Sequence, residues 1–176
     1  MRIGIDARFY GPSGGKGIGR YTQQLIANLE KIDNENEYFI FLRQENFDLY
    51  QPKNKKFHKI LADYRWYSFE EQVYFPFKLY KLRLDLVHFL HFNTPLFYFR
   101  KFIVTIHDLI HRKSSQESST LSWLAFYFKK LAYSMVIKSA IRKSKKIITV
   151  SNFSKQEIIK YYRVKPNKIF VTYESN

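Results

Sequence analysis

The chain has 176 residues, which is enough for one domain with a buried core and too few for two ordinary domains. Hydrophobic residues make up 45% of the chain, while glycine and proline are scarce, so a disordered or low-complexity protein is excluded. Cysteine is absent, which excludes disulfides and thiolate metal sites, and the net charge is +15. Residues 51–176 hold 24 Lys and Arg against 8 Asp and Glu, so the basic charge belongs to this part.

The first predicted strand, residues 3–7, leads into a glycine-rich segment at residues 11–20 and then an amphipathic helix over residues 18–32. This order points backbone N–H groups and the positive end of a helix dipole at an anion such as phosphate. The segment matches neither the Walker loop nor the dinucleotide fingerprint, so a flexible loop without a ligand is the alternative. We expect Asp6 to hold the turn by accepting backbone N–H bonds, rather than to act as a base.

Further short apolar runs without clear alternation are typical of strands buried on both faces. They span residues 38–42, 57–61, 86–89, 103–106, 146–150 and 169–172. Helical patterns lie between them at residues 68–81, 119–143 and 154–162. Alternating strands and helices predict a single α/β domain over residues 1–176, Rossmann-like and three-layered, with a mostly parallel sheet of about seven strands.

Several polar side chains follow predicted strands, at the carboxyl edge where open α/β sheets bind ligands. His107 and Asp108 come after the strand at 103–106, and a histidine there can donate to a phosphate or a sugar hydroxyl. The alternative is a turn capped by Asp108, in which His107 is incidental. His88 and His91 flank another strand end, but they project to opposite faces of an extended chain, so we expect no metal site.

The last helix has a clear start signal, because Ser154 and Glu157 have capping-box spacing. We expect the helix to begin at Ser154, and Ser151 to lie in a second strand-to-helix turn at the carboxyl edge.

The long helix at 119–143 has an apolar stripe with helical spacing, which we expect to enter the core. Its members are Leu121, Leu124, Ala125, Phe128, Leu131, Ala132, Met135 and Val136. The opposite face mixes large aromatic and basic side chains: Trp123, Phe126, Tyr127, Lys129 and Lys130. Segments 64–67 and 74–83 repeat this mixture, which favours an anionic membrane surface as a partner. The alternative is that these rings pack against a partner domain or complete the core.

Four motifs in order resemble the amino-terminal half of family 4 glycosyltransferases. They are residues 1–8 (MRIGIDAR), residues 17–22 (GIGRYT), residues 104–109 (VTIHDL), and residues 148–154 (ITVSNFS) with 164–171 (VKPNKIFV). The resemblance implies one half of a GT-B fold, in which two Rossmann-like domains face each other across a cleft. It also implies transfer of a sugar from a nucleotide-sugar to a polysaccharide or lipid-linked acceptor, with retention of anomeric configuration.

The same resemblance implies that the glycine-rich segment reaches the donor diphosphate through Gly15, Gly17 and Gly19, and that His107 contacts the donor sugar and is the catalytic candidate. The two cations of that segment, Lys16 and Arg20, join the predicted phosphate site. The cleft or acceptor candidates are Asp6, His88, Asp108 and Ser151.

The nucleotide-sugar would be a co-substrate, and we expect no cofactor and no metal. A carboxyl-terminal donor-binding domain is expected as a partner that this sequence lacks, so we expect little or no activity from it alone. No apolar stretch is long enough to span a membrane, and we expect a cytoplasmic protein, either soluble or peripheral at the inner face of the plasma membrane. The alternative function is a non-catalytic module that binds a membrane or a partner subunit. Nucleic acid is not an expected partner, since the charge comes without a recognition motif.

Overall fold

The computed structural model describes residues 1–12, 16–109 and 123–173. The described residues form a sheet of seven strands in the order β3-β2-β1-β4-β5-β6-β7. All six neighbouring pairs are parallel, which confirms the Rossmann-like prediction. The strands are β1 (Arg2–Asp6), β2 (Glu37–Leu42), β3 (Phe57–Leu61), β4 (Leu86–Phe89), β5 (Phe102–Thr105), β6 (Lys146–Thr149) and β7 (Ile169–Val171). Each agrees with its predicted range to within one residue at either end.

Four long helices connect these strands in the described parts of the chain: α1 (Lys16–Ile32), α2 (Phe69–Lys81), α4 (Trp123–Lys143) and α5 (Asn152–Tyr162). Short 3₁₀ helices, η2 (Gln44–Asn46) and η4 (Pro166–Lys168), lie between other elements. No helix in the described ranges is long and apolar enough to cross a bilayer.

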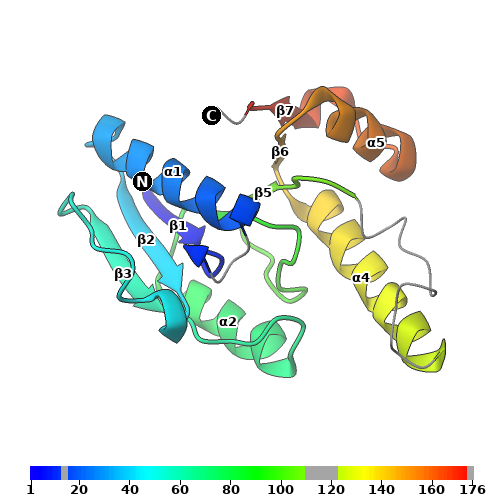
Figure 1. Ribbon diagram of the computed structural model, residues 1–176, viewed down its shortest axis with the longest axis horizontal. Coiled ribbons are helices and arrows are strands. Elements are labelled where there is room, and N and C mark those ends of the chain that lie inside the picture. The colour runs from blue at the N-terminus through cyan, green and yellow to red at the C-terminus, as the bar shows by residue number, and fades with distance from the viewer. Residues whose placement is uncertain (13–15, 110–122, 174–176) are drawn as a thin grey trace.

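The helices cover the two faces of the sheet unequally (Figure 1). Ile26 of α1 packs with Ile5 and Ile40 on one face. The larger cluster, on the other side, takes Phe75 from α2, Ile137 from α4 and Ile158 from α5. The central strands β1, β2, β4 and β5 therefore bury both of their surfaces, which is why their apolar runs show no alternation.

The predicted core stripe of the long helix is confirmed at Val136 and wrong at Leu131 and Met135. Leu131 and Met135 are 45% and 52% exposed, whereas Val136, Ile137, Ala140 and Ile141 are buried. The N-terminal half of α4 extends beyond the strands (Figure 1), so contact with the sheet, rather than helical spacing, decides which side chains are covered. Leu121 lies outside the described residues, as do the side chains of Leu124, Ala125 and Phe128 and, on the other face, those of Trp123, Phe126 and Lys129.

The predicted start of the last helix is also wrong. Ser151, not Ser154, is the N-cap of α5: its backbone is extended, and its hydroxyl accepts the Ser154 backbone N–H. Ser154 is buried in the first turn and donates from its hydroxyl to the backbone oxygen of His107 at 2.8 Å. The capping-box spacing was misleading because the serine that directly follows β6 already satisfies the helix end.

Candidate functional site

The order of strands reverses between β1 and β4, since β2 and β3 follow on one side of β1 and β5 to β7 on the other. Open parallel sheets bind ligands outside the carboxyl ends of the strands at such a reversal. A ligand site is therefore expected among the chain segments that leave β1, β4, β5 and β6 at this edge.

These four segments enclose a hollow of about 280 Å³. It is lined by Gly17, Ile18, His91, Phe92, His107, Asp108 and Val150. The glycine-rich segment and the His107-Asp108 pair thus meet in space, at the edge where the sequence places both. Ser151 follows Val150 directly but uses its hydroxyl as the cap of α5.

The glycines differ in what their missing side chains permit. A Cβ on Gly19 would lie 2.0 Å from the backbone oxygen of Gly11, so glycine is required there for α1 to approach the preceding turn. A Cβ on Gly17 would meet nothing within 4 Å, so the fold does not need a glycine at that position. Because Gly17 has no side chain, its backbone stays open to the hollow that it lines.

The other residues predicted to bind phosphate are less well placed or not described. Gly15 lies outside the described residues, and Lys16 begins α1 with a side chain that is also outside them. Arg20 is exposed on α1 and does not line the hollow. The backbone N–H groups at the start of α1 carry partial positive charge that favours an anion. The first turn of α1 contains no acidic residue that would repel one.

His107 is held from three directions. Its Nε2 lies 3.1 Å from the backbone oxygen of Leu90, and because a carbonyl only accepts, Nε2 carries the proton of this bond. The edge of its ring meets the ring of Tyr21, with centroids 4.8 Å apart. The hydroxyl of Ser154 fixes its backbone oxygen. The imidazole is therefore positioned by β4, α1 and α5 together.

His88 lies beneath this site rather than in it. Its side chain is buried, and Nε2 is 2.9 Å from the hydroxyl of Thr105 on the neighbouring strand. Burial, with a further contribution from His107, lowers the pKa of His88 to about 3, so this ring is neutral at physiological pH. The described residues hold no group of three or more side chains suited to a metal ion.

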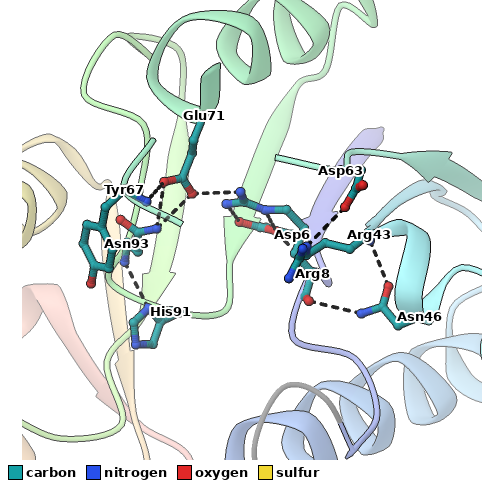
Figure 2. A network of polar contacts seen from close by, with 9 residues as sticks. All are labelled: Asp6, Arg8, Arg43, Asn46, Asp63, Tyr67, Glu71, His91 and Asn93. Atoms are coloured by element: carbon teal, nitrogen blue, oxygen red, sulfur yellow. Dashed lines mark hydrogen bonds and ion pairs between the residues drawn. The ribbon is translucent and has the colours of Figure 1, made fainter. Parts of the chain in front are cut away.

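Asp6 does not line the hollow and belongs to a buried polar network (Figure 2). Its carboxylate accepts two hydrogen bonds of 2.8 Å from the guanidinium of Arg8 and a longer one from the Arg8 backbone N–H. The predicted turn contact thus exists, but the side chain of Arg8 is the main partner. Arg8 Nη1 also lies 2.7 Å from the carboxylate of Glu71.

Glu71 is fully buried in the first turn of α2 and receives donors from several segments. The Asn93 amide donates to both of its oxygens, and the backbone N–H of Tyr67 donates to one of them. Burial raises the pKa of Glu71, although Arg8 opposes the shift. Burial would lower the pKa of Arg8, but Asp6 and Glu71 outweigh it and the pKa is raised.

Aromatic rings complete the environment of Arg8 and connect it to the hollow. The guanidinium carbon lies 4.3 Å from the ring centroids of Trp66 and Phe75. Trp66 stacks on Phe9, whose ring is 5.0 Å from that of His91. The backbone N–H of Asn93 lies 3.2 Å from His91 Nδ1, so the network supports the wall to which His91 belongs.

Comparisons with known proteins agree with this geometry. The family model Glycosyltransferase Family 4 matches residues 15–174. A solved structure of the apo form of the lipopolysaccharide outer core galactosyltransferase WaaB superposes with a TM-score of 0.59 and 16% identity. The match covers 100% of this chain and 46% of the galactosyltransferase, so the chain spans about half the length of that relative. A comparison with curated proteins finds no match.

Proposed function

Because the chain belongs to glycosyltransferase family 4, we propose that it forms the acceptor-side half of a retaining GT-B glycosyltransferase. The reaction moves a sugar from a nucleotide-sugar to a hydroxyl of a polysaccharide or lipid-linked acceptor. The observation that carries the proposal is that Gly17, at the start of α1, and His107, after the end of β5, line the same hollow.

The donor diphosphate is assigned to the start of α1. Backbone N–H groups at a helix N-terminus bind phosphate through direct hydrogen bonds and the helix dipole. The open space beside Gly17 supports close approach of such an anion. Lys16 belongs to the same turn, and its charge adds to the attraction.

The donor sugar is assigned to the part of the hollow beside His107. A ring fixed by Leu90, Tyr21 and Ser154 loses little freedom when it contacts a sugar hydroxyl, which favours a positioned reaction over loose binding. Asp108 is exposed beside it and lines the same hollow, where it suits an acceptor hydroxyl.

A second domain is part of this proposal. The hollow, at about 280 Å³, is slightly smaller than the roughly 300–1,000 Å³ of ordinary small-molecule pockets, and a nucleotide-sugar has several rings. A facing donor-binding domain would supply the remaining surface and exclude water. We expect the 176-residue chain alone to transfer no sugar detectably, because an open half-site lacks most of the positioning and electrostatic stabilisation.

Backbone NMR tests the assignment without requiring turnover. Adding UDP or GDP to the ¹⁵N-labelled chain should shift the amides of residues 16–20, and the corresponding nucleotide-sugar should also shift those of residues 107–108. Gly17→Ala should reduce the first set of shifts and His107→Ala the second. His58→Ala is the matched control for His107→Ala, because His58 lies on β3, at the far edge of the sheet. Shifts confined to other parts of the sheet, or equal loss with both histidine variants, would contradict the proposal.

A further inference from the structure

The opposite edge of the sheet carries a cluster of positive side chains that the candidate site does not use. Two hollows of about 530 and 460 Å³ lie there and meet at Lys145. Their basic lining residues form what we term the basic edge: Arg100, Lys101, Arg142, Lys143, Lys145, Lys146, Arg163, Lys165 and Lys168. Most of these residues precede β5, β6 or β7, so the basic edge lies at the amino ends of the strands. The candidate active site lies at the carboxyl ends.

Three of these cations have a role in the fold. Lys168 donates to the backbone oxygens of Ile141 and Arg142, at the end of α4, and Lys143 donates to that of Leu96. Lys146 lies 3.5 Å from the backbone oxygen of Asn167. Lys168 thus meets C-terminal carbonyls of α4, which favour positive side chains, and the other two lysines meet carbonyls of neighbouring segments.

The remaining six cations are exposed, and of these Arg100 lies over the Tyr80 ring, 5.5 Å from its centroid. None of the nine forms an ion pair with a carboxylate in the described parts of the chain. The one acidic residue lining these hollows is Asp85, and its carboxylate accepts the backbone N–H of Arg2 at 2.7 Å. Burial, together with the charge of Lys145, lowers the pKa of Lys168, as expected where cations gather without counter-ions.

Exposed phenylalanines border the same surface. Phe99 lines the larger hollow and is 70% exposed, and nearby in the chain Phe97 is 56% exposed. Lys143 Nζ lies 4.4 Å from the Phe99 ring centroid, and Lys146 Nζ lies 4.6 Å from that of Phe170, which is 48% exposed. Aromatic rings among lysines are typical of surfaces that enter the headgroup layer of a membrane.

We propose that the basic edge docks this chain on an anionic lipid bilayer, with the phenylalanines entering the interface. A bilayer uses both components of the surface, since headgroups attract the cations and the interface accepts the rings. A soluble phosphate would use only the cations. The inference does not rest on the proposed transfer reaction, because vesicle binding needs neither donor nor acceptor.

Co-sedimentation with vesicles tests the proposal. The chain should bind vesicles of equal parts phosphatidylglycerol and phosphatidylcholine, should not bind phosphatidylcholine alone, and should dissociate as salt is raised. The triple variant Lys101→Gln, Lys145→Gln, Lys165→Gln should lower the partition coefficient on the order of 100-fold, since each cation near such a surface contributes about a fivefold factor. These three side chains are exposed, and circular dichroism would verify that the variant folds.

The matched control is Arg65→Gln, Lys130→Gln, Lys155→Gln, which removes the same charge from positions outside the basic edge: after β3, in the N-terminal half of α4, and in the first turn of α5. It should retain most of the binding. Phe99→Ser should weaken binding to the anionic vesicles at low salt without changing its dependence on salt, because the ring carries no charge. Equal loss with both triple variants, equal binding to neutral vesicles, or binding of duplex oligonucleotides in place of vesicles would overturn the proposal. UDP-induced NMR shifts that persist in the first triple variant would show that any failure here is separate from the donor site.

Discussion

Arg8 Nη1 lies 2.7 Å from the carboxylate of Glu71, and both side chains are fully buried. Arg8 follows β1 at the base of the glycine-rich segment, whereas Glu71 begins α2, so the pair joins segments that are distant in the sequence. Asp6 completes the pairing from the other side of the guanidinium. A charged network whose three members do not line the hollow therefore supports the wall of the candidate site.

Arg8→Met should lower the free energy of unfolding by about 3–5 kcal/mol, because it leaves two buried carboxylates without their cation. Urea denaturation measures the change. Arg2→Met is the control, since Arg2 pairs with Glu37 at the surface and its loss should cost less than about 1 kcal/mol. Similar losses for the two variants would contradict the role assigned to the network.

Two glycine substitutions should have opposite signs. Gly19→Ala should destabilise the protein by at least 1–3 kcal/mol, roughly the cost of overpacking, because the new Cβ would overlap the Gly11 backbone. Gly17→Ala should stabilise it by about 0.5–1 kcal/mol, because alanine is favoured within α1 and meets open space. Thermal unfolding of both variants checks the signs, and a stabilising Gly19→Ala would refute the close approach described above.

His88 should make stability fall as the solution is acidified. Its pKa is about 3 in the folded chain against 6.5 as the ordinary value, so the unfolded chain binds a proton between these pH values and the folded chain does not. The stabilisation is complete above pH 6.5 and is lost as pH falls toward 3, by up to about 1.4 kcal/mol per pH unit.

Unfolding free energies measured at several pH values test this dependence. His88→Gln keeps a polar partner for Thr105 and should flatten the slope, whereas His58→Gln, at a half-exposed position, should retain it. A slope unchanged by His88→Gln would show that other groups cause the acid sensitivity.

Ser151→Ala should destabilise the chain by about 0.5–2 kcal/mol, the ordinary range for loss of an N-cap. Ser151→Asp should restore most of the loss, because its carboxylate can accept the same N–H and favours the positive end of α5. Chemical denaturation compares the three proteins. If Asp failed to restore stability while Ala destabilised, the hydroxyl of Ser151 would have another role.

The strands could be predicted because short apolar runs buried on both faces leave a strong local signal. The meeting of the glycine-rich segment with His107 followed from topology, since parallel strands bring their carboxyl ends to one edge. Both predictions used features contained within a single element or a general rule for parallel sheets.

The parts that could not be predicted depend on partners distant in the sequence. Nothing local identifies Arg8, Glu71 and Asn93 as one network, although an arginine two residues after Asp6 was a usable hint. Helical spacing placed Leu131 and Met135 in the core, but the position of α4 relative to the sheet leaves both exposed. The capping-box spacing predicted a helix start at Ser154, but the position of Ser151 directly after the end of β6 makes Ser151 the N-cap.

Together, the proposed membrane surface and the proposed transfer site would set a minimum length for the acceptor, because they lie at opposite ends of the strands. A strand such as β5, with four residues, advances roughly 13 Å along its axis. If the amino ends of the strands rest on headgroups, a hydroxyl reaches His107 only when at least that much chain separates it from its lipid anchor. The length of the strands would then select acceptors already extended by earlier sugars, because the hydroxyl of a shorter acceptor would not reach His107.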